Sequence, residues 1–205
     1  MAASCCRWLM SFCSLVTCIV SVVVCVVVAA GLAALVLYLL FRPHLIHATA
    51  ASVDLTTFSL APKAWTLRYN LSLALDLRNP NSRVALLYHA VAADAYYQDQ
   101  RFSHAGLPDF SQPMGSSDTT HISPVAFQGQ YQLVGGIAAA AFRREATEGM
   151  FSIHVSLAAK TNLQMVGVIR LPGPDLKVDC PLRVQRRSAS APPPHVHPTA
   201  CHVTY

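Results

Sequence analysis

A run of 33 residues without any charged or histidine side chain, from Leu9 to Phe41, constrains this chain more than any other feature. Valine, leucine, alanine, isoleucine and cysteine dominate it. A bilayer core about 30 Å thick needs about 20 helical residues at about 1.5 Å each. The run is longer than that, so we predict a transmembrane anchor within residues 9–41. Its span is expected near Val16–Leu39, with Pro43 ending the helix.

A cleaved signal peptide is the competing interpretation, because Arg7 precedes the apolar run and the small residues 29–31 could form a cleavage site. The apolar part of a signal peptide is about 7–15 residues long, and this run is more than twice that. We therefore expect an uncleaved anchor. Its orientation stays open at this point, since Arg7 and the α-amino group on one side nearly balance Arg42 on the other.

Alternation of apolar and polar residues predicts that most of the remaining chain is β-structure. Between Trp65 and Leu77 every odd position is large and apolar, which is typical of a strand with one face in a core and the other in water. Further candidate strands lie at Val53–Leu60, Val84–Tyr97, Val125–Leu133, Phe151–Leu157, Met165–Leu171 and Leu176–Val184. Half-buried antiparallel strands pack as two sheets, so we predict an all-β fold, a seven-stranded antiparallel β-sandwich.

These elements divide the chain into five parts. They are a short N-terminus (1–8), the anchor (9–41), a linker (42–51), the β-sandwich domain (52–185) and a tail (186–205). One short helix is expected inside the domain at Ile137–Glu148, because it is rich in alanine and Gly149 follows it. The tail is rich in serine, alanine, proline and histidine and has little to bury, so we expect it to be disordered.

The charge balance argues against a nucleic-acid partner. Of the 15 lysines and arginines only Arg7 and Arg42 precede position 48, which leaves 13 against 10 aspartates and glutamates in the rest of the chain. Arg186 and Arg187 of the tail account for most of this excess. The basic stripe that neutralises phosphates in nucleic-acid-binding proteins is missing from the sequence.

No sequence motif points to catalysis, a metal or a cofactor. The sequence contains no nucleophile elbow, phosphate loop or HExxH motif, so we predict that the protein is not an enzyme. Most of the nine histidines are scattered without cysteine or carboxylate at zinc-ligand spacing. The only cluster, His195, His197, Cys201 and His202, falls in the tail, and we predict neither a metal site nor a cofactor there.

Two kinds of covalent modification are suggested. Asn70 begins the only N-x-[ST] sequon and takes a solvent-facing position of its strand, so we predict its glycosylation if the domain is lumenal or extracellular. Cys5 and Cys6, beside the anchor, are candidates for S-palmitoylation, with a role as small apolar filler residues as the alternative. Cys180 takes an inward position and is expected to be a buried, inert thiol, since a disulfide to Cys201 would need the tail to enter the core.

An ordered series of motifs leads to a known family. The motifs are Arg78-Asn79-Pro80-Asn81-Ser82-Arg83, Tyr96-Tyr97-Gln98-Asp99-Gln100-Arg101, Leu107-Pro108-Asp109-Phe110 and Lys177-Val178-Asp179-Cys180-Pro181-Leu182-Arg183-Val184. With the anchor before them, the chain resembles plant late-embryogenesis-abundant proteins of the second subgroup, and more narrowly their membrane-bound NDR/HIN-like branch, over Phe41–Val184. The turn motif Asn79, Pro80 and Asn81 also has a physical interpretation: asparagine side chains bond nearby backbone and proline fixes φ, which makes a rigid structural corner.

The resemblance implies a fibronectin-III-like sandwich, a cytosolic N-terminus, a domain outside the plasma membrane and a part in defence and stress responses. We therefore predict a single-pass, non-catalytic plasma-membrane protein that displays an interaction domain to a protein partner. The alternative is a membrane-protective or lipid-binding module for water deficit, which an apolar cavity open toward the bilayer would favour and a filled core would oppose. Homo-oligomerisation stays open. The brief N-terminus and the His/Pro tail depart from the family pattern.

Overall fold

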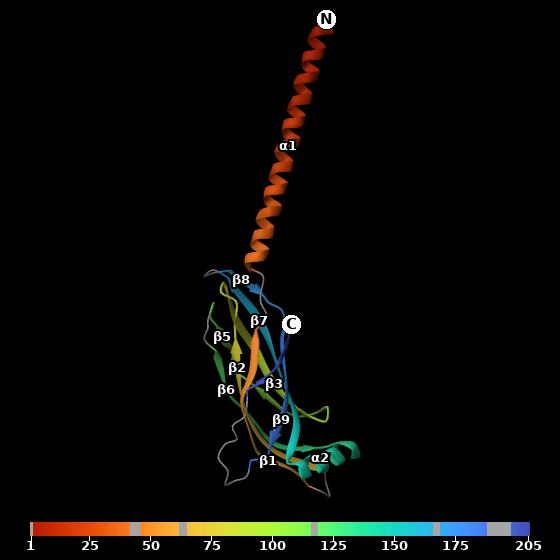
Figure 1. Ribbon diagram of the computed structural model, residues 1–205, viewed down its shortest axis with the longest axis vertical. Helices are drawn as coiled ribbons and strands as arrows, with labels where there is room; N and C mark the ends of the chain where they lie inside the picture. The colour runs from red at the N-terminus through yellow and green to blue at the C-terminus, as the bar shows by residue number, and fades with distance from the viewer. Residues whose placement is uncertain (1, 42–45, 62–64, 116–118, 166–168, 188–197) are drawn as a thin grey trace. The chain divides into compact units, whose positions relative to one another are not determined.

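The computed structural model describes residues 2–41, 46–61, 65–115, 119–165, 169–187 and 198–205 (Figure 1). The chain forms two compact units, residues 1–42 and 43–205. The first is a single helix, α1 (Ala2–Phe41), of 40 residues. Its segment Thr17–Val36 has a mean hydropathy of 3.0 and buries none of its side chains, so it is long and apolar enough to cross a membrane. The residues expected to form a separate N-terminus, 1–8, are helical from Ala2 onward.

The second unit is made of two antiparallel sheets with one helix (Figure 1). Its elements are β1 (His47–Ala61), β2 (Thr66–Arg78), β3 (Val84–Tyr97), β4 (Gln100–Gly106), β5 (Phe110–Gln112), β6 (Thr120–Gln132), α2 (Gly136–Glu148), β7 (Met150–Met165), β8 (Ile169–Pro172), β9 (Leu176–Gln185), β10 (Thr199–Ala200) and β11 (His202–Thr204). One sheet has the strand order β10-β1-β2-β6, and the other β11-β9-β7-β3-β4, with β5 also paired to β3 and β8 to β7. The predicted all-β sandwich is confirmed.

Two details of the predicted architecture are wrong. The described residues form eleven strands rather than seven, because β4, β5, β10 and β11 lack the alternation of apolar and polar residues that predicted the others. The linker was expected to extend to residue 51, but β1 begins at His47. Its early residues pair with the end of β2, and Ala48 and Ala50 are buried there although alanine carries little hydrophobic signal.

The core lies between the sheets and is filled by the alternating side chains that the sequence pattern singled out. In β2, Leu67, Leu71 and Leu75 are all fully buried. Phe58 of β1 lies at the centre of an aromatic cluster, with its ring centroid 5.3 Å from that of Tyr97 and 4.8 Å from that of Phe151. Edge-to-face rings of this kind add to the burial term that holds the two sheets together.

The predicted helix is confirmed as α2, which lies at the end of the sandwich where β7 begins (Figure 1). Phe142 attaches it to the core, with its ring centroid 5.6 Å from that of Phe58. Gly149 ends it in the left-handed conformation with φ 74°, which glycine adopts without a Cβ clash. Glu145 is only 5% exposed, and its carboxylate accepts a hydrogen bond from the Tyr97 hydroxyl at 2.9 Å.

The expectation of a disordered tail is wrong for the end of the chain. β10 pairs with β1 of one sheet and β11 with β9 of the other, so the C-terminal segment bridges the two sheets. Cys201, between these two strands, forms a disulfide with Cys180 of β9. Cys180 is therefore not the free thiol that its inward position suggested. The Ile46 amide also donates to the Tyr205 hydroxyl at 3.4 Å, which ties the last residue to the start of β1. Residues 188–197 lie outside the described residues.

Candidate functional site

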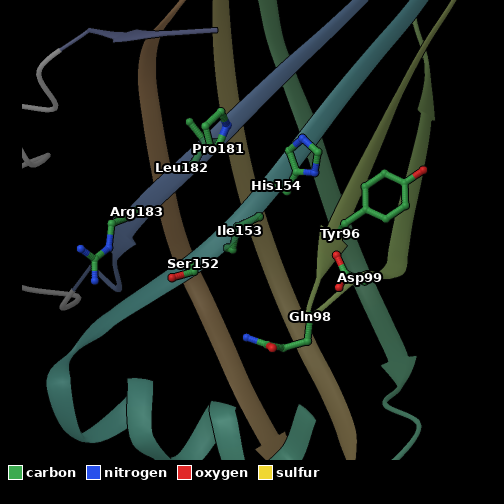
Figure 2. Close-up of a pocket in the computed structure, with 9 residues that line it drawn as sticks. All are labelled: Tyr96, Gln98, Asp99, Ser152, Ile153, His154, Pro181, Leu182 and Arg183. Carbon is green, nitrogen blue, oxygen red and sulfur yellow. The ribbon is translucent and has the colours of Figure 1, made fainter. Parts of the chain in front are cut away.

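An open groove of about 490 Å³ lies on the outer face of the larger sheet (Figure 2). Strand register explains how it is built. Tyr96 of β3 pairs with His154 of β7, and His154 with Pro181 of β9, so three rings form a row across three neighbouring strands. Two residues further along, on the same face of the sheet, Ser152 of β7 pairs with Arg183 of β9. The Tyr96 and His154 rings lie 6.0 Å apart between centroids and are tilted by 36°.

The β3–β4 hairpin forms one end of this groove. Gln98 and Asp99 form its two-residue loop and have φ of 50° and 59°. Positive φ at both central residues is the mark of a type I′ turn, whose twist matches that of paired antiparallel strands. The turn directs both side chains toward the groove, where Figure 2 shows them beneath Tyr96. The motif Tyr96–Arg101 thus contributes three of the residues that line the groove.

Asp179 supplies fixed negative charge beside the groove. Its carboxylate lies 3.2 Å from the Lys177 ammonium and 3.5 Å from His154 Nε2. Partial burial disfavours its ionisation, but a hydrogen bond with Ser156 and the charge of Lys177 outweigh this and hold the pKa of Asp179 below its usual range. The Asp179 carboxylate is therefore ionised at neutral pH beside the His154 ring.

The chemistry of the groove suits recognition. Its side chains offer hydrogen-bond donors from Arg183, His154 and Gln98, a carboxylate from Asp99 and a flat aromatic face from Tyr96. These groups can bind a polar peptide or a similar surface by hydrogen bonds and stacking. Within the described residues, no group of three or more histidine, cysteine, aspartate or glutamate side chains could hold a metal ion.

The turn motif forms a buried polar corner between β2 and β3. Asn79 is fully buried, and its amide donates to the Val84 carbonyl at 2.9 Å and to the Pro113 carbonyl at 3.3 Å. Its side-chain oxygen accepts from the Asn81 backbone amide at 3.0 Å. The Asn81 carbonyl accepts in turn from the Gly115 amide at 2.8 Å. These contacts hold the chain where it passes from one sheet to the other, and the structural role of the motif stays a prediction.

The modification sites predicted from sequence do not converge on the groove. Asn70 lies in β2, on the other sheet, where it pairs with Thr57 and Gln128 and is half-buried. Cys5 and Cys6 lie in the first turns of α1, and their side chains are outside the described part of the structure. Their modification stays a prediction.

The sequence analysis missed the groove and three histidine–aspartate pairs. His104 Nδ1 lies 2.8 Å from Asp94, and His121 Nδ1 lies 2.6 Å from Asp76. Both are directly opposite pairs on neighbouring strands, and the third is the pair of His154 and Asp179. The two-residue hairpin between β3 and β4 fixes the register that brings His104 opposite Asp94, and this pair could have been predicted. The register of β2 with β6, which brings His121 opposite Asp76, is not contained in the sequence because a long connection joins these strands.

An apolar helix followed by a two-sheet sandwich with an asparagine corner defines a class of helix-plus-sandwich proteins. Residues 74–185 match the family model described as late embryogenesis abundant protein, which is more than half of the chain. The chain therefore belongs to the late embryogenesis abundant family, and within it to the NDR1/HIN1-like proteins.

Three relatives from Arabidopsis thaliana support this assignment. The chain is 32% identical to NDR1/HIN1-like protein 10 over 169 residues, which cover 82% of this chain and 73% of the relative. It is 30% identical to NDR1/HIN1-like protein 3 over 188 residues, covering 91% and 80%. It is 35% identical to NDR1/HIN1-like protein 2 over 124 residues, covering 60% and 50%. The first two alignments extend beyond the sandwich into α1.

Proposed function

We propose that this protein is a single-pass, non-catalytic membrane protein that displays its β-sandwich to a protein partner in plant defence and stress responses. In this proposal α1 crosses the plasma membrane with its N-terminus in the cytosol and the sandwich outside. Cys5 and Cys6 are then available for acylation on the cytosolic side, and Asn70 for glycosylation on the other.

The buried core between the sheets is the observation that best supports an interaction role over lipid binding. The side chains between the sheets, including Phe58, Phe127 and Tyr97, are almost entirely buried. A sandwich that carried an acyl chain would need space between its sheets, so we do not pursue the lipid-binding alternative. The groove on the outer face offers polar and aromatic groups instead, which suit contact with another protein surface.

The disulfide supports a domain outside the cytosol. Disulfides form and persist in oxidising compartments and are rare in the cytosol, where glutathione keeps thiols reduced. Cys180 and Cys201 form such a bond between β9 and the C-terminal segment. Asn70 is consistent with the same side, because its side chain lies on the outward face of β2, between buried Tyr69 and Leu71.

Glycosylation of Asn70 tests the placement. We expect the protein from plant membranes to shift in mobility on endoglycosidase treatment, and the shift to disappear in Ser72→Ala while it persists in Ser72→Thr. Ser72→Ala removes the hydroxyl that the sequon requires, Ser72→Thr keeps it, and both variants leave Asn70 in place. If no form shifts, protease protection of sealed vesicles decides the side. In sealed vesicles whose extracellular face is outermost, a domain that is digested only after the cytosolic face has been exposed would contradict the placement.

Photo-crosslinking tests the interaction role. A photoreactive residue at Ser152, in the groove, should give discrete protein adducts in intact tissue. The same residue at Ala126, exposed on β6 of the other sheet, is the matched control and should give none. Equal adduct patterns at both positions, or adducts only at Ala126, would argue against the groove as the binding surface.

A further inference from the structure

Three arginines gather at one end of the sandwich, the end at which β1 begins. Arg78 closes β2 and pairs with His47, the first residue of β1. Arg83 directly precedes β3, whose first residue pairs with the last residue of β7. Arg170 of β8 pairs with Gln164, next to that same end of β7. We call the three side chains the basal arginines.

The basal arginines are free to meet a ligand. All three are exposed. Within the described residues none of them has a carboxylate partner within 4.0 Å, whereas Arg101 and Arg187 are both paired. The nearest described acid on β2, Asp76, is already held by His121 at 2.6 Å. Among the described residues, the positive charge at this end of the domain is therefore not compensated by a carboxylate.

The asparagine corner holds two of the basal arginines in fixed positions. Arg78 and Arg83 stand at either end of the corner, and its buried hydrogen bonds fix the backbone between them. Asn79 donates to the carbonyl of Val84, the residue that follows Arg83, at 2.9 Å. Side chains on a fixed backbone lose less freedom on binding than those on a loose loop.

Two exposed apolar side chains lie at the same end of the domain as the basal arginines. Met114 is 40% exposed and follows Pro113, whose carbonyl accepts from Asn79. Leu171 is 44% exposed and follows Arg170. Guanidinium groups beside a few exposed aliphatic side chains suit the boundary between headgroups and acyl chains of a bilayer. A stable protein interface buries about 800 Å² on each side and prefers aromatic anchors, which these residues do not supply.

We propose that the basal arginines bind the phosphate groups of lipid headgroups in the bilayer that holds α1. Guanidinium groups bind phosphate oxygens through two parallel hydrogen bonds. The short connection between α1 and β1 favours lipid headgroups as the source of the phosphate. Only residues 42–46 join the two elements, and such a stretch spans about 20 Å at most, so the base stays near the bilayer surface. This short connection gives the headgroups a high effective concentration at the base. The inference rests on the proposed membrane anchor.

Tryptophan quenching in the full chain tests the proposal. The sequence has two tryptophans, so Leu171→Trp in a Trp8→Phe, Trp65→Phe background gives a single reporter at the base. Trp8→Phe alone leaves Trp65, beside Gly136 of α2 at the opposite end, as the matched reporter. Each protein is reconstituted in phosphatidylcholine vesicles that contain a headgroup-nitroxide lipid, with and without phosphatidylglycerol.

We expect the base reporter to be quenched several-fold more than Trp65, and more strongly when phosphatidylglycerol is present. Arg78→Gln with Arg83→Gln should lower the base quenching at least threefold, since one arginine near an anionic surface changes binding by about fivefold. Arg143→Gln with Arg144→Gln, which removes the same charge from α2, should change nothing. Neither pair is buried, and an unchanged unfolding temperature verifies the fold.

The outcomes separate the inference from the proposed function. If the chain stays with vesicles through a carbonate wash but the Arg78/Arg83 variant keeps its quenching, the base is merely tethered and the inference is wrong. If Trp65 is quenched as strongly as the base reporter, membrane contact is not confined to the base, and the assignment of the site to the basal arginines is wrong. If the wild-type chain is not retained by vesicles at all, the membrane anchor fails and the inference fails with it.

Discussion

Asn79 shows how much one side chain contributes to this fold. It is fully buried and satisfies two carbonyl groups and one amide at the corner between the two sheets. A buried polar group left without its partner costs about 1–3 kcal/mol. We predict that Asn79→Ala lowers the free energy of unfolding by about 3 kcal/mol, measured by thermal unfolding of the full chain in detergent. Ser82→Ala, an exposed change in the same corner, should stay within about 0.5 kcal/mol of the wild type. Equal effects of the two changes would contradict the structural role of the motif.

At the residue scale the sequence indicated the corner but not its partners. Asn-Pro-Asn predicts a rigid turn because both asparagines can bond to nearby backbone. Two of the groups that complete the network, Pro113 and Gly115, lie more than 30 residues further along the chain. Local sequence contains no information about such contacts. The same limit hid the pair of His121 and Asp76, which only the register of β2 and β6 brings together.

At the scale of elements, the C-terminal segment depends on its disulfide. β10 and β11 contribute few strand residues each, and their sequences carry no periodicity. The bond between Cys180 and Cys201 closes a loop with a sequence separation of 21, which corresponds to about 3 kcal/mol of stabilisation in the chain-entropy account. We predict that Cys180→Ala with Cys201→Ala frees β10 and β11 to exchange amide hydrogens at least tenfold faster, while β2 and β3 stay protected. Alkylation of both cysteines in the untreated protein would contradict the bond itself.

Element prediction succeeded where a pattern was long and failed where it was short. β2 and β9 show unbroken alternation and were predicted with nearly the right bounds. The tail was expected to be disordered because it is poor in apolar residues. Its ordered end is instead held by a covalent bond and by pairing with the edges of β1 and β9, neither of which depends on hydrophobic content.

At the scale of the whole molecule, two buried tyrosines link global stability to alkaline pH. Burial raises the pKa of Tyr88 and Tyr97 well above the ordinary value, and for Tyr97 the hydrogen bond to Glu145 adds to the effect. Above about pH 10 these groups ionise in the unfolded chain but stay protonated in the folded one. The stability they contribute is therefore fully present below pH 10 and is lost as pH rises toward the folded-state pKa. The slope that each residue contributes should approach about −1.4 kcal/mol per pH unit once its hydroxyl is fully ionised in the unfolded chain.

Denaturant unfolding between pH 10 and pH 11 measures this slope. Tyr97→Phe should make it shallower by about 1 kcal/mol per pH unit over this range, and Tyr88→Phe by a similar amount. At neutral pH, Tyr97→Phe should still destabilise the fold because Glu145 loses a hydrogen bond in a buried site. A slope that neither change alters would show that both hydroxyls ionise as easily in the folded protein as in the unfolded chain.

The contact between Ile46 and Tyr205 has a mechanical consequence. Because the last residue is bound beside the first strand, β1 has neighbours along both edges, with β2 on one side and β10 on the other. Tension that reaches the domain through residue 46 is applied at the start of β1, and we consider a pull directed along this strand. The hydrogen bonds on both edges lie perpendicular to that pull and are loaded together in shear rather than one after another. The sandwich is thus built to resist a force transmitted along its own chain, as any pull between α1 and a partner held by the domain would be.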